Sequence, residues 1–78
     1  MASKISLKIQ DQIERIILKI LYEEKSIRSL KLLTEGVLEK AMIERITVSE
    51  KNIIIIINLM NKNRKILFTQ KEGWKIRI

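Results

Sequence analysis

A run of nine residues, Asn52 to Met60, restricts the fold of this chain more than any other segment. It holds five consecutive isoleucines, Ile53 to Ile57, and has the length of a helix. Isoleucine is β-branched, which makes it a mediocre helix former and a good strand former. The run by itself therefore leaves two interpretations open, a helix or a buried central strand.

The residues on either side of the run favour the helix. Thr47-Val48-Ser49-Glu50 matches a helix-start box, in which a capping hydroxyl precedes a glutamate by three residues. Asn61-Lys62-Asn63 provides a stop, because asparagine tolerates the left-handed conformation that ends many helices. We therefore expect a helix that starts at Thr47 or Ser49 and ends near Asn61 or Asn63.

Residues 11–24 carry the clearest helical pattern. Five apolar residues recur at i, i+3, i+4, i+7 and i+8, which is one face of a helix: Ile13, Ile16, Ile17, Ile20 and Leu21. Asp11 is a candidate cap, with Glu14 completing the box. Residues 1–10 are ambiguous, since their isoleucines fit both a strand alternation and a step of four. We expect a helical extension there.

The next helix is expected within residues 29–45, after a connector at 25–28 in which a very short strand would fit. Ser29 and Thr34 are both candidate caps. Gly36 either sits inside one helix, at a cost of about 1 kcal/mol against alanine, or divides a turn at 29–33 from a helix at 34–45. The sequence leaves both open. The expected inward stripe is Leu30, Leu33, Val37, Leu38 and Met42.

Residues 64–78 predict a β-hairpin. Apolar and polar residues alternate on both sides of Gln70-Lys71-Glu72-Gly73, and Gly73 suits the positive φ of a short hairpin loop. We expect Trp74, Ile76 and Ile78 to face the helices and Phe68 to be buried. Lys75 and Arg77 should point outward. Outside the hairpin, Tyr22 is expected to be half-buried.

The composition bounds the function. The 78 residues fit a single domain, 1–78, and contain neither cysteine nor histidine. The usual metal ligands and the usual general base are thus missing, so we expect no enzyme, no cofactor and no metal site. The longest apolar run is five residues, far short of a membrane span, and a cytoplasmic location is expected. Abundant lysine and glutamate without cysteine are typical of thermophiles.

The charge of +7 is concentrated toward one end. Residues 49–78 hold seven Lys or Arg against two acids, a net of +5, whereas residues 1–48 hold nine against seven, a net of +2. A cationic end on a small domain is the electrostatic footprint of a nucleic-acid binder.

The predicted order over residues 11–78 is helix, connector, helix, turn, helix and hairpin, which resembles the winged helix-turn-helix superfamily, including its small archaeal members. The predicted fold class is thus mainly α with a C-terminal hairpin, or wing. The resemblance implies transcription regulation or nonspecific duplex binding, with the third helix in the major groove of double-stranded DNA and the wing on its backbone. The residues it implies as contacts are Lys51, Ile54, Asn58 and Lys62 on the helix, Arg64 and Lys65 at the junction, and Lys71, Lys75 and Arg77 on the wing.

A helical wheel for the third helix leaves two orientations open. Either Ile53, Ile56, Ile57 and Met60 face the core, or Ile55, Ile56 and Leu59 do. In both cases Ile54 and Asn58 point outward with a second isoleucine beside them. Exposed isoleucines more often mark a protein interface than a DNA-reading face. The alternative function is therefore an accessory subunit of a polymerase or another nucleic-acid machine, bound through the Ile54/Ile55 face. A homodimer through residues 5–24 is a further expectation.

Overall fold

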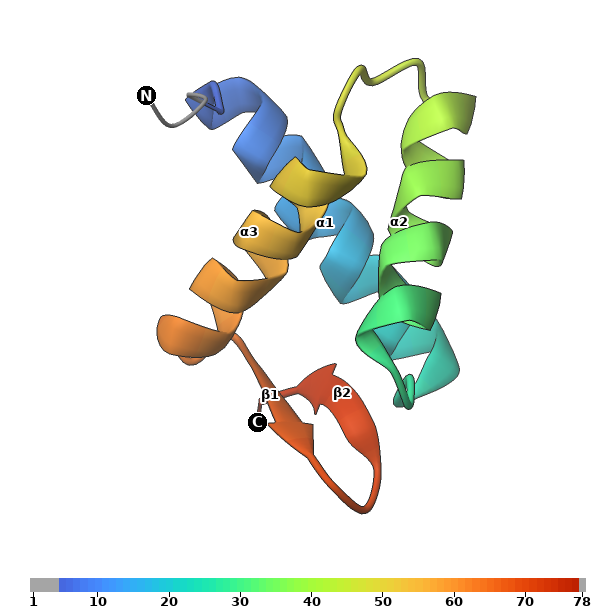
Figure 1. Ribbon diagram of the computed structural model, residues 1–78, viewed down its shortest axis with the longest axis vertical. Helices are drawn as coiled ribbons and strands as arrows, with labels where there is room; N and C mark the ends of the chain where they lie inside the picture. Colours follow the sequence, from blue (N-terminus) through green and yellow to red (C-terminus); the bar gives the residue numbers. More distant parts are fainter. Residues whose placement is uncertain (1–4, 78) are drawn as a thin grey trace.

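Over the residues that the structure describes, the chain folds into three helices followed by a two-stranded antiparallel hairpin (Figure 1). The computed structural model describes residues 5–77. The helices are α1 (Leu7–Glu24), α2 (Leu30–Ile43) and α3 (Glu50–Lys62), and the strands are β1 (Ile66–Thr69) and β2 (Gly73–Ile76). The predicted fold class, mainly α with a C-terminal hairpin, is confirmed. The alternative of a strand at 52–60 is excluded, because that run lies within α3.

A serine begins each helix. The hydroxyl oxygens of Ser6, Ser29 and Ser49 each accept a hydrogen bond of 3.1 Å from the backbone N–H three residues on. Asp11 and Thr34, two predicted caps, instead lie inside α1 and α2. The helical extension before residue 11 is confirmed from Leu7 onward, while residues 1–4 lie outside the described range.

The ends of α2 and α3 share one arrangement in which arginine occupies the left-handed position. Arg45 and Arg64 have φ values of 60° and 62°. The backbone N–H of the next residue donates a hydrogen bond back across the last turn of the helix. After α2, Ile46 N–H donates to Ala41 O at 2.8 Å, and after α3, Lys65 N–H donates to Met60 O at 2.9 Å. This is the Schellman pattern, which usually takes glycine. The prediction that asparagine would hold the left-handed position after α3 is wrong, since Asn63 has φ −86°.

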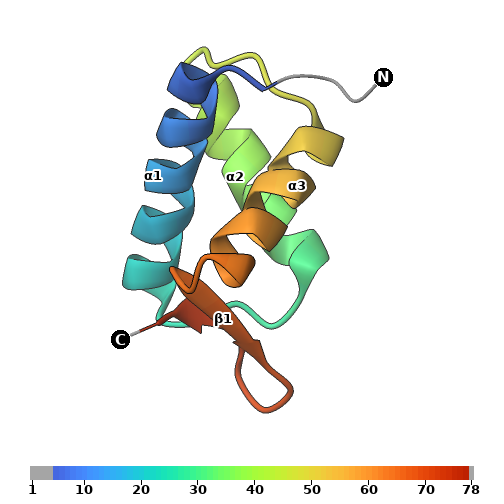
Figure 2. The same cartoon turned by 90° about the vertical axis from the view of Figure 1, so that its left-hand side faces the viewer.

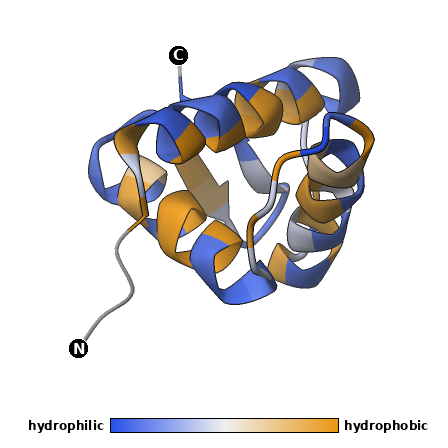
Figure 3. Cartoon of the chain, turned by 90° about the horizontal axis from the view of Figure 1, so that it is seen from above, coloured by the Kyte–Doolittle hydropathy of each residue, from blue (hydrophilic) through white to orange (hydrophobic). Residues whose placement is uncertain are grey.

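The core lies between the three helices, whose apolar sides face one another (Figure 3). All five residues of the predicted α1 stripe are buried. α2 runs unbroken through Gly36, which selects the single helix from the two alternatives and excludes the break. Its buried face is Leu33, Thr34, Val37 and Ala41, rotated from the predicted stripe, and Met42 is 70% exposed. In α3 the buried residues are Ile53, Ile56, Ile57 and Met60, which selects the first of the two orientations.

The hairpin is fastened to the helices through its second strand. Trp74 and Ile27 exchange backbone hydrogen bonds of 2.9 and 2.7 Å, so the connector contributes the short strand expected at 25–28. Gly73 has φ 90°, and a Cβ there would lie 2.3 Å from the Ile27 carbonyl oxygen. The tip, residues 70–72, projects beyond the helices (Figure 2).

Two aromatic predictions need correction, and one holds. Trp74 is buried as expected and packs against Phe68, with ring centroids 5.2 Å apart. Phe68 itself is 46% exposed, because it pairs with Trp74 near the projecting end of the hairpin. Tyr22 is 73% exposed rather than half-buried, since it lies on the outer side of α1 beside Lys25. Ile78 lies outside the described residues.

Candidate nucleic-acid interface

The outward face of α3 carries a polar and cationic stripe. Lys51, Ile55, Asn58 and Lys62 recur at i, i+4, i+7 and i+11, and all four are exposed. Their direction is determined by the opposite face, where Ile53, Ile56, Ile57 and Met60 are buried. The only acidic residue of α3, Glu50, lies in its first turn, where a carboxylate suits the helix dipole.

Ile54 borders this stripe on the side of α2. It is partly buried and lines a hollow of about 250 Å³ with α2 residues that include Leu30 and Thr34. The expected pair of exposed isoleucines therefore reduces to Ile55, which is 38% exposed. A single partly exposed isoleucine makes only a small apolar patch.

The junction between α3 and the wing brings Arg64 and Lys65 to different environments. Arg64 is exposed. The Lys65 ammonium donates a 2.8 Å hydrogen bond to a Glu14 carboxylate oxygen on α1, and Gln10 donates to the other oxygen. Partial burial raises the pKa of Glu14, but the hydrogen bonds from Lys65 and Gln10 and the charge of Lys65 lower it more, so the net pKa is below the ordinary value. The Glu14 hydrogen bond likewise raises the pKa of Lys65.

The wing residues do not form one group. Lys71 is exposed in the tip. The Lys75 ammonium lies 2.7 Å from Glu72 and borders a hollow at the end of α1 with Tyr22 and Lys25, so Lys75 is not part of the tip. Arg77 is exposed just after β2, at the base of the hairpin, where its N–H donates to the Lys65 carbonyl oxygen at 3.2 Å.

Two cations beside these positions were not predicted from the sequence as contacts. Arg28 is exposed next to the wing, since a Cβ on Gly73 would lie 2.6 Å from the Arg28 Cα. Lys31 is exposed on the first turn of α2 and lines the same hollow as Ile54. The short strand expected at 25–28 was the available signal in the sequence, because its pairing with the hairpin places the start of α2 beside the wing.

Comparisons add no relative. No protein-family model, no curated protein and no solved structure matched the chain. Within residues 5–77, no group of three acidic, histidine or cysteine side chains could hold a metal ion. No helix in the same range has the length and apolarity to cross a membrane. The candidate interface is thus defined by its own geometry: the α3 stripe with Arg64, Lys71, Arg28 and Lys31 around it.

Proposed function

We propose that this protein is a non-enzymatic winged helix-turn-helix protein that binds double-stranded DNA. The observation that carries the proposal is the exposed stripe of α3, which presents two lysines and an asparagine without an acid among them. α3 would enter the major groove and the wing would lie against the backbone.

Each exposed residue of the stripe has a contact that suits its chemistry. Asn58 can make a bidentate pair with an adenine edge, and Ile55 can contact a thymine methyl group. Lys51 and Lys62, at the two ends of α3, would bind phosphates and orient the helix without reading sequence. Lys65 is engaged with Glu14 and contributes to the orientation of the wing more than to the contact.

The experiment is a duplex titration with paired charge removals. Lys51→Ala with Lys62→Ala should weaken binding of any duplex, because each removes a phosphate contact. Lys8→Ala with Lys19→Ala is the control, since it removes the same charge from exposed positions on α1. The expected result is a much larger loss for the α3 pair than for the α1 pair. Equal losses would show that only net charge matters, and the docking geometry would then be wrong.

A protein partner is the second candidate, supported by the exposure of Ile55 in the middle of the stripe. Ile55→Asp is the better probe, since Ile54 is partly buried and an aspartate there would disturb the contact between α2 and α3. If α3 docks on a protein, Ile55→Asp abolishes that complex while thermal unfolding changes little. If α3 reads DNA, the same substitution weakens duplex binding instead, because it adds a negative charge facing phosphates.

A further inference from the structure

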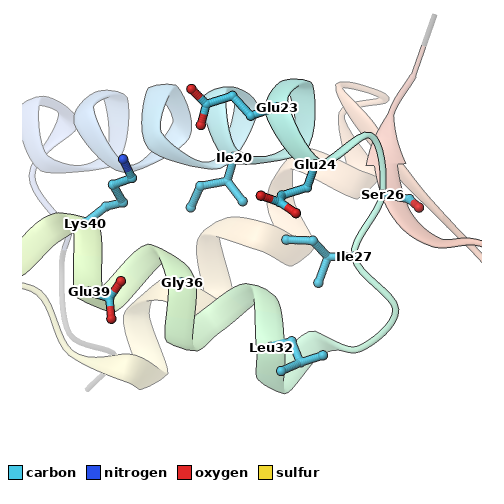
Figure 4. A pocket seen from close by; sticks show the side chains of 9 residues that line it. All are labelled: Ile20, Glu23, Glu24, Ser26, Ile27, Leu32, Gly36, Glu39 and Lys40. Carbon is cyan, nitrogen blue, oxygen red and sulfur yellow. The ribbon is translucent and has the colours of Figure 1, made fainter.

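A second surface lies between α1 and α2, away from the α3 stripe. The two helices and the connector enclose a groove of about 420 Å³ (Figure 4). Its apolar part is formed by Ile20, Ile27, Leu32 and Gly36, and its polar residues are Glu23, Glu24, Ser26, Glu39 and Lys40. No residue of α3 or of the hairpin lines it. Because the three helices pack in pairs around one core, the outer side of the α1–α2 contact faces away from α3.

Gly36 deepens this groove without being required by the fold. It lies inside α2, where glycine costs about 1 kcal/mol against alanine. A Cβ at this position would lie 3.7 Å from Ile20 Cδ1, an ordinary contact, so the core has room for a side chain. The destabilising residue therefore has no explanation in the packing of the chain itself. Because Gly36 has no side chain, the groove has space there for a side chain of another molecule.

The side of α2 that carries Gly36 is a mixed stripe of two hydrophobic residues, the glycine and one glutamate. Leu32, Gly36, Glu39 and Ile43 recur at i, i+4, i+7 and i+11, so they share one side of the helix. Leu32 is 56% exposed and Ile43 is 71% exposed, although both are large hydrophobic residues. Such a stripe beside a groove is the geometry in which an amphipathic helix docks.

The charge of the groove is opposite to that of the protein. Three carboxylates and one ammonium line the groove, while the whole chain has a net charge of +7. Within residues 5–77 the acidic members of ion pairs are Asp11, Glu14 and Glu72, so none of the groove carboxylates is paired. A cationic partner would therefore meet carboxylates that have no competing partner within the chain.

We infer that this groove binds a basic amphipathic helix of another protein. An apolar side chain of that helix would enter over Gly36 against Ile20 and Leu32. Its lysines or arginines would face the carboxylates of Glu23, Glu24 and Glu39. The surface is small, so the complex is of the transient class. Because no residue of α3 lines the groove, a helix bound there leaves the α3 stripe open, and the inference does not depend on the proposed function.

The test uses the whole chain and a synthetic helical peptide with two leucines at i and i+4, flanked by lysines. Titration followed by amide chemical shifts should show changes confined to the C-terminal part of α1, the connector and the side of α2 that lines the groove. Gly36→Leu, which fills the floor and improves helix propensity, should weaken binding about tenfold or more, equivalent to about 1.4 kcal/mol. Glu23→Gln with Glu39→Gln should weaken it and reduce its salt dependence, since only Glu24 remains of the three carboxylates.

Controls separate the groove from general charge attraction. Glu35→Gln with Glu44→Gln removes the same charge from exposed positions outside the groove, and it should leave peptide affinity nearly unchanged. A peptide with glutamate in place of lysine should not bind. The inference is overturned if the lysine peptide shifts α3 or nothing at all, or if Gly36→Leu binds it equally well. It is also overturned if the groove signals shift with protein concentration alone, because a second copy would then be the occupant.

Discussion

The two glycines of the chain have opposite roles, and substitution by alanine should separate them. Gly73 has a positive φ and lies against the Ile27 carbonyl, so an added Cβ meets both backbone strain and a clash. Gly73→Ala should lower the free energy of unfolding by about 2 kcal/mol or more. Gly36→Ala should raise it by up to about 1 kcal/mol, because a Cβ fits there. Chemical denaturation of both variants checks this, and equal effects would contradict the assigned roles.

The Glu14–Lys65 pair should make stability depend on pH in a defined direction. The pKa of Glu14 is lowered in the folded state, so its contribution is present above the pKa of the unfolded glutamate, about 4.3. That contribution is lost as the pH falls through the lower folded pKa. The pKa of Lys65 is raised, so its contribution is present below the ordinary lysine pKa and lost as the pH rises through the folded value.

Glu14→Gln isolates this contribution. The difference in melting temperature between wild type and variant should be constant near neutral pH and should shrink below about pH 4.3, where the unfolded glutamate gains its proton. The control is Glu35→Gln, which also replaces a carboxylate with an amide but does so at an exposed position. A difference for Glu14→Gln that stays constant down to strongly acidic pH would show that the carboxylate has no special stabilisation.

Short-range sequence signals predicted some helix boundaries and missed others. The α3 helix could be predicted, despite its isoleucines, because Ser49 caps it and its neighbours mark its ends. The Thr47–Glu50 box begins two residues before the observed cap, Ser49, whereas the Asp11–Glu14 box lies inside α1, which already begins at Leu7. A start box is thus informative only where the preceding turn is not already helical.

Side-chain exposure was harder to predict than the elements, because it depends on how far each element projects. Phe68 alternates like a core residue, yet the hairpin extends past the helices at that point and leaves it 46% exposed. The face of α2 could not be derived from its own pattern, since α1 and α3 both cover it. The same holds for Ile54 in the candidate site, which α2 partly covers.

The positive φ of Arg45, directly after α2, predicts that glycine at this position would stabilise the fold. Arg45→Gly should raise the free energy of unfolding by about 1 kcal/mol, because a Cβ disfavours positive φ and the Schellman hydrogen bonds stay intact. Urea unfolding monitored by Trp74 fluorescence measures it. Arg28→Gly is the matched control: Arg28 has no positive φ, so glycine should not stabilise there. Stabilisation by both, or by neither, would contradict the strain at Arg45.

A homodimer would have little apolar surface of α1 available to it. The apolar face of α1 is used in the core, so a homodimer through residues 5–24 would have to rest on exposed residues such as Leu7 and Tyr22. The acidic groove and the α3 stripe lie on different sides of the bundle. This separation could not be derived from the sequence, in which acids and bases alternate along α1 and α2.

The salt dependence of duplex binding tests the whole proposed interface. Six exposed cations of the candidate interface have no ion-pair partner in residues 5–77: Arg28, Lys31, Lys51, Lys62, Arg64 and Lys71. If each binds a phosphate, the logarithm of affinity should fall with the logarithm of salt concentration with a slope of about −5.

Lys71→Ala should make the slope about one unit shallower, because one counterion fewer is released. Lys75→Ala should change it less, since Lys75 is paired with Glu72. Titrations at several salt concentrations measure these slopes, and an effect of Lys75→Ala as large as that of Lys71→Ala would mean that the wing contacts DNA with its other side.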